Sequence, residues 1–414
     1  MATTAVSAGK PGAAIFAPDA AAIRDSVLRL ARWLEANDYQ GYDTFDGLNA
    51  RFVRPLTFER PFLRTVLQQG VRRFPLNLRA LLGVRRSRST KAMGFIARGY
   101  IRLHRTTGET GWGERARAVL EWLIANQSPG YSGACWGNHF DYQSRTFYLP
   151  AGTPTIVWTS LIGHAFLDAY VHFHEARYLE IAASACEHIL RDLAAISDGE
   201  DAACISYIPG KISMVHNANA LGASLLARTH AQTGNPSYRA LAERAIRYTV
   251  KYQRAGGSWY YGEKPNLRWV DNFHTAYVLD SLLHFARSSG GDESVENCLR
   301  PGYAYWKETF FLANGTPRYY DRKTLPIDIQ CSSQAIDTLV FFADRDPDAL
   351  PLAVKVARWT IAHMQDESGY FYYRRYTPWL VNKTATLHWG QATMLCALAG
   401  LLERLIRVQS PHEE

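Results

Sequence analysis

Residues 154–174 read PTIVWTSLIGHAFLDAYVHFH, a stretch of helical length that is apolar on nearly every side. Ile156, Leu161 and Phe166 would fall on different faces of one helix. A helix without a polar face must be covered by other elements all round. Stretches with little charge recur at 216–229, 271–285, 330–342 and 386–402. We therefore predict a protein built around several buried helices.

Helices of a second kind lie between the buried ones. Segments 114–125, 176–193, 237–253 and 351–365 alternate charged and apolar positions at helical spacing, as helices with one solvated face do. The buried helices start near residues 91, 154, 216, 271, 330 and 386, in steps of 63, 62, 55, 59 and 56. A helical hairpin of nearly sixty residues therefore repeats six times. This count predicts an all-α fold, an (α/α)6 toroid or six-hairpin barrel, rather than an open superhelix.

The N-terminal quarter differs from the repeats. Residues 1–18 are rich in Ala, Gly and Ser without an apolar core, which is typical of a flexible leader. We assign residues 19–90 to an N-terminal helical and loop extension, and residues 91–414 to the toroid. Within the extension, residues 39–49 are too polar for a core and are expected to fold over the ring as a lid.

The charge of +8 is concentrated in one window. Residues 51–91 hold eleven basic residues and one acid, so the rest of the chain is close to neutral. This distribution argues against a nucleic-acid-binding protein. The segment Arg72–Lys91 would contact an anionic membrane surface or an acidic glycan, and its alternative role is a solvated face of an outer helix.

Two further features bear on location. No run of about eighteen apolar residues is present, which excludes a membrane-spanning helix. The six cysteines are scattered without a C-x-x-C motif, as expected for reduced thiols in the cytoplasm. A cytoplasmic protein, peripheral at the inner membrane if the basic segment binds lipid, is the resulting expectation.

The loops that lead into the buried helices share a composition. Residues 253–261 and 365–373 run from Gln through Gly to a cluster of aromatic residues, a pattern typical of tight turns. Because these loops precede the inner helices, they should gather at one end of the ring. Six helix N-termini would then point partial positive charge into one mouth, which suits ligands with hydroxyl and carboxylate groups.

Polar residues cluster where the loops meet the inner helices, and each has a structural alternative. Asp271 and Asp328 are good N-cap residues, a role that needs no chemistry. Read chemically, Asp141, Asp271 and Asp328 would supply carboxyls for glycosidic acid/base work. Proton abstraction from a uronic acid would suit another set, His139, His274 and His388 with Tyr142, Tyr260 and Tyr261. The candidate substrate-binding residues are Trp136, Asn138, Gln143, Arg145, His216, Asn217, Asn219, Trp259, Tyr261, Asn272, Arg318, Gln330, Gln334 and His388, with Tyr42, Asp43 and Asp46 from the lid.

Motifs for other chemistries are missing from the sequence. There is no G-x-G-x-x-G, no P-loop and no G-x-S-x-G nucleophile elbow. The pair His172 and His174 is spaced so that a helix sends the rings to different sides, and no H-E-x-x-H is present. We therefore expect neither a cofactor nor a metal ion.

Several motifs resemble one protein family. They are WGNHFDYQ (136–143), PTIVWTS (154–160), NAN (217–219), GSW (257–259), DNFHT (271–275), PIDI (326–329), YDTFD (42–46) and NLR (77–79). The pattern is similar to the toroidal proteins encoded in bacterial exopolysaccharide and capsule clusters, and it covers most of residues 40–345. Such families have Trp where this chain has Tyr142. Relatives by fold include glycoside hydrolases, polysaccharide lyases, glucuronyl epimerases and terpene cyclases.

The resemblance implies three hypotheses. The first is an enzyme that acts on a poly- or oligosaccharide, acidic or lipid-linked, by acid/base chemistry; hydrolysis is favoured over lyase or epimerase action because carboxylates mark the helix starts. The second is a non-catalytic glycan-binding or scaffold subunit of a biosynthetic complex. The third is a terpenoid cyclase, which would need an Asp-rich motif such as D-x-D-D that this sequence lacks.

Overall fold

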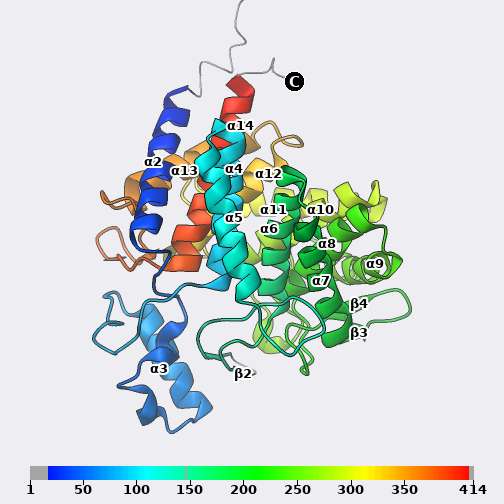
Figure 1. The fold of residues 1–414 in the computed structure, drawn as a ribbon, viewed down its shortest axis with the longest axis horizontal. Helices are drawn as coiled ribbons and strands as arrows, with labels where there is room; N and C mark the ends of the chain where they lie inside the picture. The colour runs from blue at the N-terminus through cyan, green and yellow to red at the C-terminus, as the bar shows by residue number, and fades with distance from the viewer. Residues whose placement is uncertain (1–16, 145–146, 410–414) are drawn as a thin grey trace, which may run out of the picture.

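The computed structural model describes residues 17–144 and 147–409, and its inner layer is a ring of helices (Figure 1). The ring consists of α4 (Thr90–Thr107), α6 (Ile156–Phe173), α8 (His216–Thr233), α10 (Asn272–Ser289), α12 (Ile329–Phe342) and α14 (Thr393–Gln409). Each helix packs against the next, and α14 packs against α4, so the ring is closed. The predicted (α/α)6 toroid is confirmed.

A second layer of helices surrounds the ring. It consists of α5 (Thr110–Ala125), α7 (Ala176–Asp192), α9 (Pro236–Lys251), α11 (Glu293–Thr309), α13 (Ala349–Met364) and α2 (Ala17–Ala36). The first five each pack on the inner helix that precedes them in the chain. Helix α2 instead packs on α14 and α13, through an apolar stripe that includes Ile23, Val27 and Leu34.

The position of α2 differs from the domain boundary that the sequence predicts. The sequence puts residues 19–90 in an extension, whereas the structure uses α2 as the sixth outer helix. The physical reason is that α14 needs an apolar cover and α13 already packs on α12. The two ends of the described chain therefore close the double ring together.

Two turns that lead from an outer helix to the next inner helix show why a Gln followed by a Gly recurs in the sequence. Gln253 donates from Nε2 to the carbonyl of Gly257 at 3.0 Å, and Gln365 does the same to Gly369 at 2.9 Å. Both glycines have positive φ, and a Cβ on either would collide with the next outer helix. At Gly369 the neighbour is the carbonyl of Arg29 in α2, 2.6 Å from the added atom. Only glycine allows this close approach.

Short strands and turns fill the end of the ring where the inner helices begin. They form the antiparallel pairs β1 (Tyr142–Gln143) with β2 (Tyr148–Leu149) and β3 (Ala195–Ser197) with β4 (Ala203–Ile205), and the antiparallel sheet β5 (Ile327–Asp328), β6 (Arg374–Arg375), β7 (Val381–Asn382). The turns η1 (Asp46–Asn49), η2 (Arg54–Thr57) and η3 (Pro265–Leu267) are 3-10 helices. The segment η4 (Leu387–Ala392) is kinked at Trp389 and Gly390, where the backbone is not helical, and leads into α14.

Residues 37–89, which we call the covering segment, lie over this same end. They contain α3 (Pro61–Arg73) and form a lobe below the ring in Figure 1. Bridges join Gly41 to Ser87 within the segment and Tyr42 to Thr386 at the start of the last ring element. The segment therefore occupies the mouth that the sequence predicts to be open to substrate.

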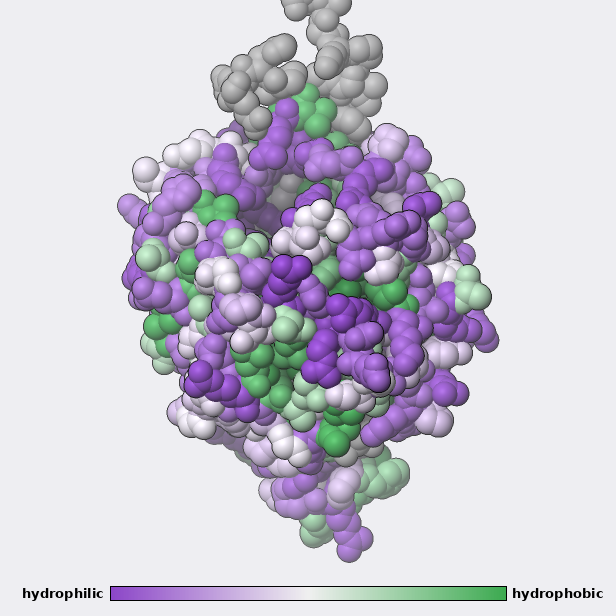
Figure 2. All heavy atoms as spheres, turned by 90° about the vertical axis from the view of Figure 1, so that its right-hand side faces the viewer, coloured by the Kyte–Doolittle hydropathy of each residue, from purple (hydrophilic) through white to green (hydrophobic). Residues whose placement is uncertain are grey.

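The outer surface of the covering segment is unusually apolar. Phe62 is 74% exposed and Leu81 is 75% exposed, and Trp379 of the β6–β7 loop is 85% exposed. Hydrophilic and hydrophobic residues lie next to one another on the lower end of the molecule in Figure 2. None of the helices in the described chain is long and apolar enough to cross a membrane.

Candidate functional site

The predicted carboxylates Asp271 and Asp328 lie at the mouth as helix caps. The Asp271 carboxylate accepts a hydrogen bond from the backbone N–H of His274 at 3.0 Å, at the start of α10. The Asp328 carboxylate accepts one from the backbone N–H of Gln330 at 3.1 Å, at the start of α12. Both residues are buried and satisfy orphan backbone donors, as caps do.

Two of the three predicted carboxylates are also neutralised by arginines. Asp328 accepts from Nε of Arg374 at 2.9 Å inside the protein. Asp141 pairs with Arg54 at 2.6 Å and accepts from the hydroxyl of Tyr148, also at 2.6 Å. Burial alone would raise the pKa of Asp141, but these hydrogen bonds and the Arg54 charge lower it. Both carboxylates are therefore already engaged by an arginine side chain.

Other predicted residues build the scaffold. Trp136 donates from Nε1 to the carbonyl of Leu123 at 2.9 Å, and Trp259 donates to the carbonyl of Thr249 at the same distance. Both rings are buried in the hairpins, so they are not surfaces on which a sugar stacks. The side chains of Gln143, Asn219 and Asn272 likewise hydrogen-bond to nearby backbone groups.

Asp271 and His274 form one Asp–His pair at the mouth. His274 Nδ1 lies 2.7 Å from the Asp271 carboxylate, which also accepts from Nε1 of Trp269 at 2.9 Å. Trp269 stacks on Tyr261 with the ring centres 4.5 Å apart. The adjoining pocket, which also touches His216, has a volume of about 10 Å³. It holds a water molecule at most.

The remaining predicted residues differ in their surroundings. Buried polar atoms without a partner in the described chain are Asn138 Oδ1, His216 Nδ1, Asn217 Oδ1, Gln330 Oε1 and Arg318 Nε. Tyr142 packs edge-on against Phe45, with ring centres 5.3 Å apart. Arg145 lies outside the described residues.

Gln334 is not at the mouth, because one further turn of α12 places it in a cavity at the other end of the ring.

A second Asp–His pair lies deeper, under the covering segment. Asp43 hydrogen-bonds to Nδ1 of His388 inside the ring, and both side chains are fully buried. The ring of Trp158, in the first turn of α6, is 5.6 Å from that of His388. Lys91, in the first turn of α4, places Nζ 4.9 Å from the centre of the same Trp158 ring. We call Asp43, Lys91, His139, Trp158 and His388 the mouth cluster.

The protonation states in the mouth cluster are set by burial. Burial lowers the pKa of Lys91 to about 7, although the charge of Asp43 opposes this change. Burial also lowers the pKa of His139 to about 4 and the pKa of His388 below its ordinary value. Both imidazoles are therefore neutral at pH 7, while the ammonium of Lys91 is poised to gain or lose a proton.

The geometry leaves one nitrogen of each histidine available. Since Nδ1 of His388 faces the Asp43 carboxylate, it carries the proton, and Nε2 keeps a lone pair. His388 Nε2 and His139 Nδ1 are buried and have no partner in the described chain. His388 stands in η4, directly before a kink at which Trp389 and Gly390 have non-helical backbone angles. The cluster thus holds an oriented base beside a lysine with a matched pKa.

A buried ion pair holds Asp43 in place. Arg79 donates from Nε to the Asp46 carboxylate at 2.7 Å and from Nη2 to the carbonyl of Asp43 at 2.9 Å. The backbone N–H of Asp43 donates to Asp46 at 2.8 Å, and Arg79 also lies over the ring of Tyr42, 5.8 Å from its centre. Burial raises the pKa of Asp46 to about 6 in spite of Arg79. The predicted lid residues therefore position the site.

Lys91 and Trp158 are members of the cluster that sequence reasoning did not single out. Lys91 ends the basic window and was counted with its surface charges, yet the structure buries it. The signal was its place in the first turn of a helix that has to be covered on all sides. Trp158 fell within an apolar helix and gave no separate signal.

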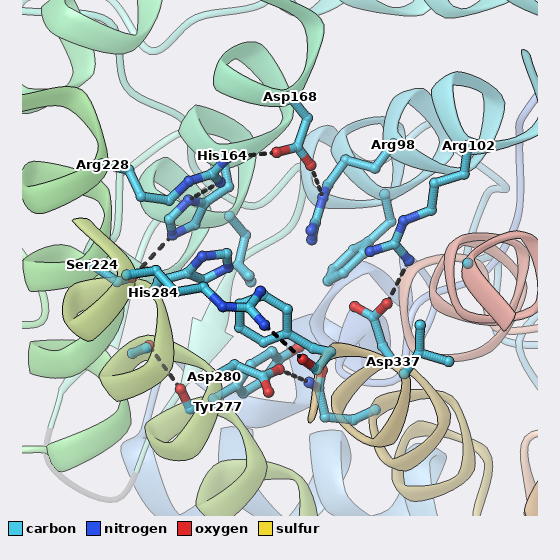
Figure 3. Close-up of a pocket in the computed structure, with 18 of the residues that line it drawn as sticks. Arg98, Arg102, His164, Asp168, Ser224, Arg228, Tyr277, Asp280, His284 and Asp337 are labelled. Atoms are coloured by element: carbon cyan, nitrogen blue, oxygen red, sulfur yellow. Dashed lines mark hydrogen bonds and ion pairs between the residues drawn. The ribbon is translucent and has the colours of Figure 1, made fainter. Parts of the chain in front are cut away.

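A larger cavity lies at the opposite end of the ring, where the inner helices end (Figure 3). This axial cavity has a volume of about 450 Å³ and is lined by all six inner helices. Its walls carry Arg98, Arg228, Asp280 and His284. Of the site residues predicted from the sequence, Gln334 alone lines this cavity within the described chain.

Comparison with known proteins gives similarity in fold. No protein-family model and no curated sequence match this chain. Among solved structures, cellobiose 2-epimerase from Bacillus thermoamylovorans is 10% identical to this chain, with a TM-score of 0.60. The match covers 77% of this chain and 88% of the epimerase chain. The GH76 alpha-mannanase of Bacteroides thetaiotaomicron is 14% identical with a TM-score of 0.58, over 77% and 87%. A polysaccharide lyase is 11% identical with a TM-score of 0.59, over 95% and 99%.

Proposed function

We propose that this protein is a carbohydrate-active enzyme of bacterial surface polysaccharide biosynthesis. It moves a proton at a sugar carbon next to a carboxylate or carbonyl group, as a lyase or an epimerase does. The observation that carries the proposal is the mouth cluster, in which Asp43 orients His388 beside a lysine whose pKa is about 7. The toroidal fold of a cellobiose 2-epimerase and a polysaccharide lyase supports the class by analogy.

The reaction follows from the state of each side chain. Nε2 of His388 takes the proton from the sugar carbon, and the electrons of the C–H bond pass into the neighbouring carboxylate or carbonyl as an enolate. Protonated Lys91 stabilises the charge on that oxygen. If the glycosidic oxygen on the adjacent carbon then leaves with a proton, the product is unsaturated. If water instead delivers a proton to the opposite face of that carbon and protonated His388 gives its proton to solvent, the product is the epimer.

Glycoside hydrolysis, which the sequence favours, has weaker support from the site. Hydrolysis requires two carboxyls on opposite sides of one glycosidic bond, one of them protonated. Asp328 is held by Arg374 and Asp141 by Arg54, so both carboxyls are already engaged in ion pairs. Asp271 already accepts hydrogen bonds from Trp269 and His274. Lyase or epimerase action therefore replaces hydrolysis as the first proposal.

The experiment that tests this proposal measures proton exchange. Uronic-acid and neutral oligosaccharides are incubated with the full-length protein in D₂O, and NMR follows deuterium incorporation at carbon and any new product. We expect exchange that falls by on the order of 100-fold or more in His388→Gln. The competing Asp–His pair is tested by His274→Gln, which should retain most of the activity. Loss in His274→Gln with full activity in His388→Gln would overturn the assignment.

A non-catalytic glycan-binding subunit is the second candidate. The observation that favours it is that Asp43 and His388 are fully buried, so the closed structure admits no sugar to the mouth cluster. The enzyme proposal therefore requires the covering segment to move. Sugar binding without deuterium exchange or product, unchanged in His388→Gln, would establish the second candidate and exclude the first.

The surface of the covering segment supports membrane contact as part of the proposal. Phe58, Phe62 and Leu81 are exposed, and Arg60, Arg73 and Arg85 are exposed in the same segment. Apolar side chains among cations fit the interface of an anionic bilayer. We propose that this segment rests on the cytoplasmic face of the inner membrane, next to an acidic or lipid-linked saccharide.

Sedimentation with lipid vesicles tests the membrane contact. Vesicles of phosphatidylglycerol and phosphatidylcholine should bind the protein, and vesicles of phosphatidylcholine alone should bind it much less. The double variant Phe62→Ser, Leu81→Ser should lose binding, since both side chains are exposed and the fold does not need them. Equal binding of the variant and the native protein, or no binding to either vesicle, would reject the contact.

A further inference from the structure

The axial cavity has a built polar frame. Arg98 of α4 donates from Nε to the Asp168 carboxylate at 2.8 Å, and Arg228 of α8 donates from Nη2 to the other oxygen of Asp168 at 2.7 Å. On the far side, Arg102 of α4 pairs with Asp337 of α12. These ion pairs join four of the six inner helices around the cavity (Figure 3).

The terminal nitrogens of Arg98 make no hydrogen bond in the described chain. Its only hydrogen bond in the described chain is made through Nε, and in Figure 3 its guanidinium group points into the cavity between Asp168 and Arg102. The two terminal nitrogens, Nη1 and Nη2, therefore form a fork directed at the open space. A fork of this kind binds a carboxylate or a phosphate through two parallel hydrogen bonds.

The opposite wall is made of neutral groups that hydrogen-bond. Arg228 donates from Nη1 to Nδ1 of His164 at 2.8 Å, so the His164 proton is on Nε2, which lies 3.0 Å from Oγ of Ser224. His284 stacks on His164 with the ring centres 5.1 Å apart. Burial, reinforced by the charge of Arg228, lowers the pKa of both histidines well below the ordinary value.

Asp280 completes this wall. Its Oδ2 accepts from Nε2 of Gln334 at 2.8 Å and from Oγ1 of Thr338 at 3.0 Å. Its Oδ1 is buried and has no partner in the described chain. Burial and the charge of Asp337 raise the pKa of Asp280 well above the ordinary value.

The formal charge of the lining is positive. Seven arginines and five acids line the cavity, so the cations outnumber the anions. The carbonyl ends of the inner helices carry the opposite sign, but their field falls off within about one turn. Arg98 lies nine residues before the end of α4, which is about two and a half turns away. The deep part of the cavity therefore attracts anions.

We infer that the axial cavity is a binding site for a small hydroxylated anion, a sugar acid or a sugar phosphate, with the anionic group on the Arg98 fork and hydroxyls on Asp280 and His284. The volume of about 450 Å³ lies in the range of small-molecule pockets. Tyr277 lines the cavity, and its ring centre is 5.8 Å from Nζ of Lys91. A ligand here would reach the floor of the mouth cluster without entering through the mouth.

Isothermal titration of the full-length protein with glucuronate, glucose 1-phosphate and glucose tests the inference. One or both anions should bind at least about tenfold more tightly than glucose. Arg98→Met should abolish that preference, and Arg98→Lys should restore part of it. The control Arg191→Met changes an exposed arginine of α7 and should bind as the native protein does. Comparing the two anions identifies which anionic group the site takes.

Two further variants keep the test decisive. If Arg98→Met does not fold, Ser288→Trp narrows the cavity at α10 while leaving the Arg–Asp frame intact, and it should also lose anion binding. His388→Gln alters the mouth cluster only and should bind the anions normally. Binding lost in His388→Gln but kept in Arg98→Met and Ser288→Trp would place the ligand at the mouth. That result, or anions that bind no better than glucose, would overturn the inference.

Discussion

Asp43 and His388 are 345 residues apart in the chain and hydrogen-bonded to each other in the interior of the ring. The bond joins the covering segment to the start of the last ring element. It also fixes which nitrogen of His388 carries a proton. The same contact therefore closes the mouth and, in the proposed reaction, orients His388 as the base.

Asp43→Asn tests how the pair works. The amide keeps the size of the side chain but removes the charge that stabilises a protonated His388, so turnover should fall by on the order of 100-fold or more while KM changes little. Steady-state kinetics on the saccharide found by the exchange assay measures this. A variant that keeps native turnover would show that Asp43 only anchors the covering segment.

Lys91→Met should make the protein more stable and less active. Between about pH 7 and pH 10.5 the unfolded chain binds a proton that native Lys91 does not, so the free energy of unfolding of the native protein rises with pH. Removing the buried amine should therefore raise the free energy of unfolding at pH 7 by a few kcal/mol, because one pKa unit corresponds to about 1.4 kcal/mol. At pH 10 the increase should be much smaller.

Urea unfolding at both pH values measures the effect of Lys91→Met. Lys264→Met, at an exposed position, is the matched control and should change stability little at either pH. A Lys91→Met protein that is less stable than the native one by the same amount at pH 7 and pH 10 would mean that Lys91 has a packing role alone.

Arg374→Met should unfold the protein more easily. It leaves the fully buried carboxylate of Asp328 without its cation, a change that costs about 3–5 kcal/mol. The double variant Asp328→Asn, Arg374→Met should recover part of the loss, because no charge is then buried alone. Chemical unfolding of the single and double variants gives the coupling. Additive losses would contradict the ion pair.

Gly369→Ala should weaken the packing of α2 against the turn at residues 365–373. Gly369 has φ of +107°, and an added Cβ would lie 2.6 Å from the carbonyl of Arg29. We expect a loss of more than about 1 kcal/mol and faster hydrogen exchange in residues 17–36. Gly256→Ala in the comparable turn meets open space and should change neither measurement. Native-like exchange in Gly369→Ala would contradict the role of this turn.

Much of the fold could be predicted from local patterns. The apolar stretch at 154–174 became α6, and the predicted starts near 216, 271 and 330 agree with α8, α10 and α12 to within one residue. Asp271 and Asp328 act as N-caps, the structural role that the sequence allows. These features depend on residues a few positions apart, so the sequence specifies them directly.

By itself the sequence determined six buried inner helices, four of the outer helices with their solvated faces, and the Gly-containing turns at 253–261 and 365–373, because hydrophobic periodicity and glycine positions act locally. Only the tertiary structure decided that α2 is the sixth outer helix, that Asp43, Lys91 and His388 share one interior, and that arginines from separate helices surround the axial cavity. Those contacts exist because the ring closes. Closure brings together side chains hundreds of residues apart, and their pKa values follow from burial that no local pattern specifies.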